Sequence, residues 1–179
     1  MVKRVTVLDK NFEIFIEASK IHQAIEKMAN QMNEDLKGKD IIFLGILNGS
    51  FMFASDLYKL INLPSQITFL KLASYQGTSS TGNVKRLIGV NEDLLGKTVV
   101  VLEDIVDSGI TMENITKQLL GYEPAEIKIA TLLSKPEAIQ TSVKLDYVGM
   151  EIPNDFIIGY GLDYNGFGRN LADIYKIAI

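Results

Sequence analysis

Two unbroken apolar runs stand out in the pattern of hydrophobic and polar positions along the chain. They cover residues 41–47 and 99–102, and most of their side chains are β-branched or leucine. Such runs are typical of strands buried on both faces of a parallel sheet, because neither face meets water. Each run leads into small polar residues and then into a helix-like stretch, at 51–60 and 112–120. The pattern predicts an α/β fold.

Weaker patterns indicate the remaining elements. Alternating polar and apolar residues at 5–7 and 12–16 predict short strands. Apolar residues at helical spacing, beginning with Ile21 and Ile25, predict a helix whose N-terminus Ser19 would cap. Further strands are expected at 66–72, 127–133 and 143–148, with a last one running toward residue 179.

The second apolar run ends in the residues with the most distinctive chemistry. Glu103 and Asp104 stand at its carboxyl end, and the turn 107–111 leads into the next helix. Ligands of open α/β sheets bind off the carboxyl ends of strands, and backbone N–H groups at a helix N-terminus suit a phosphate. Carboxylates would repel that phosphate unless sugar hydroxyls or Mg²⁺ lay between them. The alternative is an ordinary strand–turn–helix whose acids form a solvated rim and a helix cap.

Composition limits the classes of function. The chain has 179 residues, 47% hydrophobic and 22% charged, which fits one compact domain. A formal net charge of −4 without basic clusters argues against nucleic acid as a partner. The absence of cysteine excludes disulfides, zinc–thiolate sites and thiol nucleophiles. Without an apolar signal core or a membrane-length span, no membrane partner is expected and the predicted location is the cytoplasm.

The single histidine offers little for catalysis. His22 lies off the apolar face of the first predicted helix, which favours a solvated position over a catalytic one. Acid–base chemistry would therefore fall to carboxylates or lysines.

The segment 99–111 resembles the signature with which type I phosphoribosyltransferases bind phosphoribosyl pyrophosphate (PRPP): an apolar strand, two acids, two apolar residues, Asp, Ser or Thr, Gly, any residue and Thr. The resemblance continues in order from about residue 10 to the C-terminus. It implies a twisted, mainly parallel sheet flanked by helices, in one domain of residues 1–179. A small hood formed by roughly 1–16 and 135–179 would cover the base. The implied PRPP-binding residues are Glu103, Asp104, Asp107, Ser108, Gly109, Ile110 and Thr111.

The same resemblance assigns the catalytic groups. Asp107 is the expected general base for the proton on purine N7, or at least its hydrogen-bond acceptor. Glu103 and Asp104 would hold the ribose hydroxyls and a Mg²⁺ ion, and Asp163 would help to hold a second Mg²⁺ near the base. Many relatives have a polar residue at the position of Ile110, whose amide can still serve.

Residues 48–50 form a second candidate anion site, between a buried strand and a helix N-terminus, although glycine-containing turns of this kind are common. They resemble the pyrophosphate-binding loop of purine phosphoribosyltransferases, in which a non-proline cis peptide frees backbone amides. The resemblance implies a cis bond between Leu47 and Asn48. Some relatives carry Lys at the position of Asn48, so here the backbone would hold the pyrophosphate. The implied pyrophosphate contacts are Leu47, Asn48, Gly49, Ser50 and Arg169.

The polar stretch 74–83 is rich in Gly, Ser and Thr, so it cannot pack a core. One reading is a hairpin tip without further role. The other, favoured by resemblance to the mobile loop of hypoxanthine-guanine phosphoribosyltransferases, is a lid that excludes water through Ser74 and Tyr75.

Base recognition is expected from the last third of the chain. Lys135 stands just past a predicted strand, where it is either a surface lysine or a ligand group. The resemblance implies that Lys135 contacts the oxygen on purine C6 and that Phe156 stacks on the base. Ile157 would supply backbone hydrogen bonds, and Asp163 would lie near the base.

Together these features imply a Mg²⁺-dependent purine salvage enzyme. It would transfer the phosphoribosyl group of PRPP to hypoxanthine, and to guanine, giving the nucleoside monophosphate and pyrophosphate. By the habit of the family it would be a homodimer or homotetramer. Two alternatives stay open: the same enzyme class acting on xanthine or another base, and a regulatory protein that senses PRPP and binds nucleic acid. The net charge of −4 argues against the second.

Overall fold

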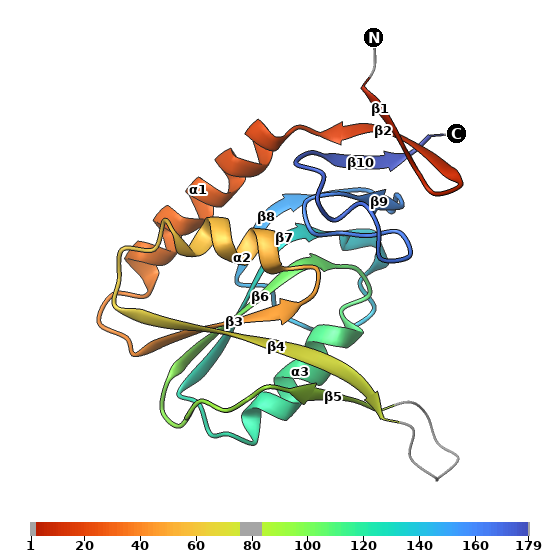
Figure 1. The fold of residues 1–179 in the computed structure, drawn as a ribbon. Coiled ribbons are helices and arrows are strands. Elements are labelled where there is room, and N and C mark those ends of the chain that lie inside the picture. The colour runs from red at the N-terminus through yellow and green to blue at the C-terminus, as the bar shows by residue number, and fades with distance from the viewer. Residues whose placement is uncertain (1–2, 76–83, 179) are drawn as a thin grey trace.

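The computed structural model describes residues 3–75 and 84–178, whose strands form two sheets (Figure 1). Within these residues the larger sheet has six strands in the order β5-β4-β3-β6-β7-β8, and the smaller has four in the order β1-β2-β10-β9. The elements are β1 (Arg4–Val7), β2 (Lys10–Ile16), α1 (Ala18–Asp35), β3 (Ile41–Leu47), α2 (Phe51–Tyr58), β4 (Ser65–Tyr75), β5 (Val84–Ile88), β6 (Thr98–Val106), α3 (Ile110–Leu120), β7 (Glu126–Ser134), the short 3₁₀ helix η1 (Pro136–Ala138), β8 (Tyr147–Glu151), β9 (Ile157–Ile158) and β10 (Ile174–Ile177).

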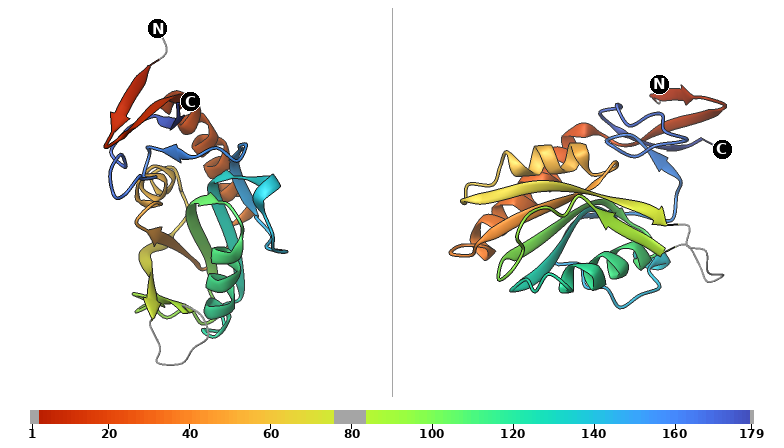
Figure 2. Two further views of the ribbon diagram at one scale, coloured as in Figure 1. Left: turned by 90° about the vertical axis from the view of Figure 1, so that its right-hand side faces the viewer. Right: turned by 60° about the horizontal axis from the view of Figure 1, so that its bottom comes forward.

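The larger sheet confirms the predicted parallel core. Strands β4, β3, β6, β7 and β8 run parallel, and among the described strands of this sheet only β5 is antiparallel to its neighbour. Helices α1 and α2 cover one face and α3 the other (Figure 2). Along β3, Phe43 enters the core under α1 and α2, whereas Leu44 enters the core beside α3. Because both faces are covered, every position must be apolar, which explains the unbroken runs.

The smaller, antiparallel sheet lies beside the carboxyl ends of the main strands, as Figures 1 and 2 show. Phe12, Ile158 and Tyr175 form its own small core. Its strands come from 4–16 and 157–177. The predicted hood began at about residue 135, but β8 (Tyr147–Glu151) pairs with β7 in the main sheet, where the Tyr147 side chain is buried in the core that contains α1.

Two local predictions are wrong in detail. Helix α1 begins at Ala18, so Ser19 lies inside its first turn, and the N-cap residue Glu17 makes no side-chain capping bond. The Ala18 amide donates instead to Asp173 Oδ1 at 2.8 Å, an acceptor 155 residues further along the chain. The strand expected at 143–148 begins only at Tyr147, because the preceding residues pack as a loop against the core beside α3.

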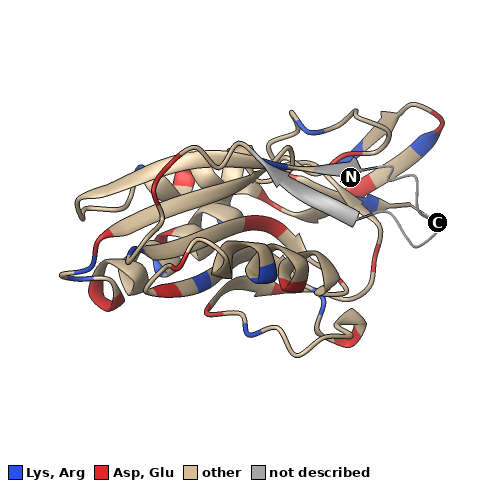
Figure 3. Ribbon diagram, turned by 90° about the horizontal axis from the view of Figure 1, so that it is seen from below, with Lys and Arg blue, Asp and Glu red and all other residues tan. Residues whose placement is uncertain are grey.

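Charges of both signs are interspersed over the side of the molecule shown in Figure 3. This distribution fits the formal net charge of −4 and the absence of basic clusters in the sequence. Over the residues that the structure describes, no helix combines the length and the apolar character needed to cross a bilayer.

Candidate active site at the carboxyl edge of the main sheet

Three segments that carry predicted site residues meet at one edge of the main sheet. The loop 48–50 follows β3, the turn 107–109 follows β6, and Lys135 follows β7. A pocket of about 360 Å³ opens there. The structure thus brings Leu47 together with most of the predicted PRPP-binding segment. The pocket is lined by Ile46, Leu47, Leu72, Glu103, Ile105, Val106, Asp107, Ser108, Gly109, Thr111 and Met112.

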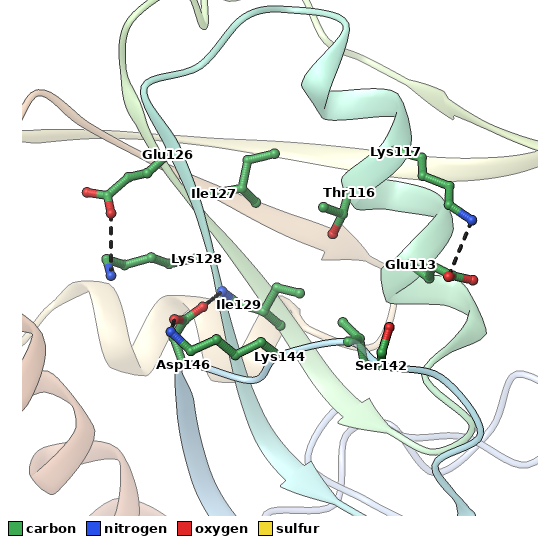
Figure 4. Close-up of a pocket in the computed structure, with 11 residues that line it drawn as sticks. Glu113, Thr116, Lys117, Glu126, Ile127, Lys128, Ile129, Ser142, Lys144 and Asp146 are labelled. Atoms are coloured by element: carbon green, nitrogen blue, oxygen red, sulfur yellow. Dashed lines mark hydrogen bonds and ion pairs between the residues drawn. The ribbon is translucent and has the colours of Figure 1, made fainter.

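A second pocket, of about 410 Å³, lies between α3, the first half of β7 and residues 142–146 (Figure 4). Its charges are balanced in pairs, drawn as dashed lines in the figure. The lysine and acid partners are Lys117 with Glu113 at 3.3 Å, Lys128 with Glu126 at 3.5 Å, and Lys144 with Asp146 at 3.0 Å. Because it lies at the amino end of β7, away from Lys135, it contains none of the predicted site residues.

Glu103 and Asp104 form the carboxylate pair at the end of β6. The Glu103 side chain is buried, and burial followed by the neighbouring Asp104 charge raises its pKa well above the ordinary value. Burial also raises the pKa of Asp104, although its Oδ1 accepts the Ile105 amide at 2.9 Å. Two carboxylates held out of water in this way favour a cation between them and the ligand.

The donor set at this edge fits Mg²⁺. The described residues contain no group of three or more His, Cys, Asp or Glu side chains that could hold a metal by themselves. Magnesium does not need one, because it is commonly held by one or two carboxylates together with substrate phosphate oxygens and water. Asp163, the predicted ligand of a second ion, forms an ion pair with Arg169 Nη2 and accepts a hydrogen bond from the Gly166 amide, both at 2.6 Å.

The turn after β6 prepares the N-terminus of α3 for an anion. Gly109 is the N-cap residue, with φ of +81°, a left-handed conformation that glycine adopts without strain. A Cβ at this position would also lie 2.3 Å from Thr141 Oγ1. Ser108 Oγ accepts the Ile110 amide at 3.4 Å, and the Ile110 side chain is exposed. The apolar side chain of Ile110 offers a ligand no hydrogen bond, so a role of its backbone amide stays a prediction.

The loop after β3 has the predicted cis peptide between Leu47 and Asn48. Ser50 supports the loop from inside: both its hydroxyl, at 2.7 Å, and its amide, at 3.3 Å, donate to the Ile46 carbonyl. Ser50 is thus already engaged, which leaves Leu47, Asn48 and Gly49 as the predicted amides to consider for pyrophosphate. Gly49 packs so tightly on the Asp104 carboxylate that a Cβ would lie 1.8 Å from Oδ2.

Lys135 and Phe156, two of the predicted base-binding residues, directly follow β7 and directly precede β9. Lys135 is buried, and its Nζ donates to Asp107 Oδ2 at 3.0 Å and to Asn154 Oδ1 at 3.2 Å. Phe156 is 46% exposed, so one face of its ring can receive a flat ligand. Its ring packs edge-on against Tyr164, with centroids 5.9 Å apart. Ile157 is buried in β9, next to the exposed Phe156.

The predicted lid lies largely outside the described residues. The backbones of Ser74 and Tyr75 form the end of β4 and pair with Lys85 and Val84 of β5. Residues 76–83 are not described, so the lid stays a prediction.

Several residues around the site were missed in the sequence. Asn154 holds Lys135, and Gly161 lies against Gly49, where a Cβ would come within 2.1 Å of the Gly49 carbonyl oxygen. Only the alternation of glycine with a bulky residue at 159–161 hinted at an unusual backbone there. His22 is exposed, as expected, and its Nε2 lies 3.6 Å from Asp56 Oδ2.

Comparison with known proteins places the chain in a family. The model of the phosphoribosyl transferase domain matches residues 16–165. The chain therefore belongs to the phosphoribosyltransferase family of enzymes.

Within this family, the chain is similar to hypoxanthine and hypoxanthine-guanine phosphoribosyltransferases. The hypoxanthine phosphoribosyltransferase of Haemophilus influenzae is 38% identical over 172 residues, 93% of this chain and 96% of that protein. The hypoxanthine-guanine phosphoribosyltransferase of Mycobacterium tuberculosis is 36% identical over 168 residues, 90% and 83% of the two chains. A crystal structure of a hypoxanthine-guanine phosphoribosyltransferase from Bacillus anthracis superposes with a TM-score of 0.85 at 33% identity, covering 92% and 98%.

Proposed function

We propose that this chain transfers the phosphoribosyl group of PRPP to hypoxanthine and guanine, in a Mg²⁺-dependent reaction that yields IMP or GMP and pyrophosphate. The observation that carries the proposal is one pocket in which the buried Glu103 carboxylate adjoins the N-terminus of α3, while the buried Lys135 pairs with Asp107 at its rim. A ligand that satisfies all of these needs a diol or metal chelate, a phosphate, and a hydrogen-bond acceptor at its far end.

The ribose 5-phosphate half of PRPP would occupy this pocket. The amides of Gly109, Ile110 and Thr111 at the N-terminus of α3 would donate hydrogen bonds to the 5′-phosphate. The Ser108 hydroxyl would donate to the same phosphate. Glu103 and Asp104 would hold the ribose hydroxyls and the Mg²⁺, and Asp163 a second ion. When bound, Mg²⁺ would neutralise charge on the departing pyrophosphate.

The pyrophosphate would lie at the loop 48–50. Because Ser50 is engaged with the Ile46 carbonyl, the amides of Leu47, Asn48 and Gly49 are the donors that we assign to the pyrophosphate. Arg169 would supply a positive charge to the leaving group. Its guanidinium is oriented by the Gly161 carbonyl at 2.6 Å and by Asp163.

The purine would lie between Lys135 and the exposed ring of Phe156. The ammonium of Lys135 would donate to the C6 oxygen of hypoxanthine or guanine, an interaction that the 6-amino group of adenine cannot accept. Asp107, at 3.0 Å from that ammonium, would accept the proton from N7 as the bond to C1 of the ribose forms. Ile157 would offer its backbone to the edge of the base, and Ser74 and Tyr75 would exclude water.

A turnover assay with PRPP, Mg²⁺ and each of hypoxanthine, guanine, xanthine and adenine tests this function. We expect nucleotide formation with hypoxanthine and guanine and little with adenine. Turnover confined to xanthine or adenine would contradict the proposed base choice. Absence of turnover together with salt-dependent RNA or DNA binding would instead support a PRPP-sensing regulator. The predicted homodimer or homotetramer and the predicted cytoplasmic location stay predictions, and light scattering would decide the first.

A further inference from the structure

Three consecutive residues between β9 and β10 have positive φ angles. They are Gly159 at +100°, Tyr160 at +49° and Gly161 at +98°. Glycine adopts such angles freely, but a tyrosine does so at a cost, and it persists there only when its surroundings hold it. The contacts of Tyr160 must therefore hold it in this conformation, and the turn that it belongs to is fixed with it.

Tyr160 is held by helix α2. Its side chain is 4% exposed, and its hydroxyl donates to Asp56 Oδ2 at 2.5 Å. Burial and the Asp56 carboxylate raise the pKa of Tyr160, so the hydroxyl keeps the proton that it donates. Asp56 is itself fixed by Lys59, the C-cap residue of the same helix, 2.7 Å away. The Tyr160 amide donates to the Leu171 carbonyl at 2.7 Å, which closes the turn from its other side.

The turn 159–161, fixed in this way, contacts both groups assigned to pyrophosphate, the loop 48–50 and Arg169. Gly161, the next residue, lies against the Gly49 carbonyl with no room for a Cβ. Its own carbonyl accepts Arg169 Nη1 at 2.6 Å, and its amide donates to the Arg169 carbonyl at 3.0 Å. Asp56 stands on the helix that begins directly after the loop 48–50. One hydrogen bond therefore joins the element behind Gly49 to the turn that orients Arg169.

We propose that Tyr160 and Asp56 are positioning residues for the pyrophosphate half of PRPP. Neither reaches the ligand: their hydrogen bond sets the distance between the loop 48–50 and the Arg169 guanidinium. The inference rests on the proposed function, because it takes the loop 48–50 and the Arg169 guanidinium to bind the same diphosphate. The base would be bound elsewhere, by Lys135 and Phe156, which come from other loops.

The test compares Tyr160→Phe and Asp56→Asn with the wild-type enzyme. Tyr58→Phe is the matched control, because it removes a hydroxyl from α2 that donates to the Ser65 carbonyl at 2.9 Å, away from the site. Each variant is assayed for KM of PRPP, KM of hypoxanthine and KM of inorganic pyrophosphate in the reverse reaction with IMP. Thermal unfolding is measured alongside.

We expect Tyr160→Phe to raise the KM of PRPP and of pyrophosphate by roughly tenfold, less than the 10²-fold that a displacement of about 1 Å can cost. The KM of hypoxanthine should stay at the wild-type value. Asp56→Asn, which keeps an acceptor oxygen, should show a smaller rise in the same two constants. Tyr58→Phe should change none of the three.

An equal rise in all three KM values, in proportion to the loss of thermal stability, would show that Tyr160 and Asp56 form a structural contact only. This result would overturn the proposal. Unchanged constants in Tyr160→Phe would overturn it as well. If Tyr160→Phe does not fold, Asp56→Asn decides by the same comparison of constants. Failure of the wild-type enzyme to turn over PRPP with any purine would instead refute the proposed function. That result is distinct from the two variant results that would overturn the positioning role.

Discussion

At the scale of single residues, the pairing of Lys135 with Asp107 governs the proposed chemistry. A buried ammonium needs partners because burial removes its hydration, and Asp107 and Asn154 supply them at 3.0 and 3.2 Å. The groups that we assign to purine N7 and to the C6 oxygen are thus held together before a base arrives. Each can be removed separately, and the two losses should differ in kind.

Asp107→Asn should lower kcat by about 10²-fold or more, because an amide cannot accept a proton from N7. The KM of PRPP should hold, since the asparagine oxygen still accepts from Lys135 and the α3 amides are untouched. Steady-state kinetics with hypoxanthine as the second substrate measures both constants. Glu137→Gln, an exposed acid just past Lys135, is the control and should behave like the wild type. An unchanged kcat in Asp107→Asn would remove Asp107 from the mechanism.

Lys135→Ala should weaken the choice of 6-oxopurines over adenine. We expect the ratio of kcat/KM for hypoxanthine to that for adenine to fall by about tenfold or more, as for a lost charge-assisted hydrogen bond. Competition between the two bases in one assay gives this ratio directly. Lys144→Ala, whose side chain is 85% exposed and pairs with Asp146 in the other pocket, should leave the ratio alone. A base profile like that of the wild type would count against the contact.

At the scale of elements, the site consists of two strand–turn–helix units side by side, β3 with α2 and β6 with α3. Their two turns meet where Gly49 packs on the Asp104 carboxylate. Only a residue without a Cβ permits this approach, so the position of the pyrophosphate loop and that of the metal-binding acid are coupled through Gly49.

Gly49→Ala should therefore raise the KM of PRPP by at least about tenfold, because a Cβ would lie 1.8 Å from Asp104 Oδ2 and the loop must move. Gly38→Ala is the control. Gly38 has φ of +74° but no atom within 4 Å of a Cβ, so alanine there strains the backbone without touching the site. It should lower thermal stability and leave the KM of PRPP unchanged. An equal rise in the KM of PRPP from the two substitutions would show that general destabilisation, and not the contact with Asp104, explains the effect at Gly49.

The central elements could be predicted from the sequence because their surroundings repeat along them. Strand β3 matches the predicted range, since helices on both faces require an apolar residue at each of its positions. The start of β8 was predicted too early, because Val143 and Leu145 are apolar for a different reason: they pack as a loop beside α3. Apolar character reports burial, and burial alone does not distinguish strand from loop.

The part of the candidate site whose residues are adjacent in the sequence could be predicted. The contacts that hold these residues in place could not be predicted. Glu103 through Thr111 form one continuous segment whose order carries the signature. The contacts that hold the site join Lys135 to Asn154, 19 residues apart, and Tyr160 to Asp56, 104 residues apart. Such pairs arise from the way the two sheets pack, and no local pattern of polar and apolar residues records them. The lid stays a prediction, because residues 76–83 lie outside the described part.

At the scale of the whole molecule, Asp173 ties the smaller sheet to the main body. Its Oδ1 accepts the first amide of α1, and its Oδ2 accepts Lys3 Nζ at 2.5 Å. Lys3, followed by the Ala18 amide, lowers the pKa of Asp173 below its usual range. A lowered pKa means that the contribution to stability is complete above the unfolded-state pKa of about 3.9 and is lost as the pH falls through the folded value.

Asp173→Asn should lower the free energy of unfolding at neutral pH by about 1 kcal/mol, because the neutral amide loses the ion pair with Lys3 and accepts the Ala18 amide less strongly. The difference from the wild type should shrink below about pH 4, where the wild-type carboxylate itself begins to take up a proton. Urea unfolding at neutral and acid pH measures both values. Asp40→Asn, which breaks an exposed pair with Lys97 at 3.2 Å, should change stability far less. A difference that grew toward acid pH would contradict this role.

A crystal structure of the enzyme with IMP would show whether one edge of the main sheet holds the phosphate, the ribose and the base together. We expect the 5′-phosphate at the amides of 109–111, the ribose hydroxyls beside Glu103 and Asp104, and the base between Lys135 and Phe156. Nucleotide bound in the pocket between α3 and residues 142–146, or anywhere else away from this edge, would contradict this expectation.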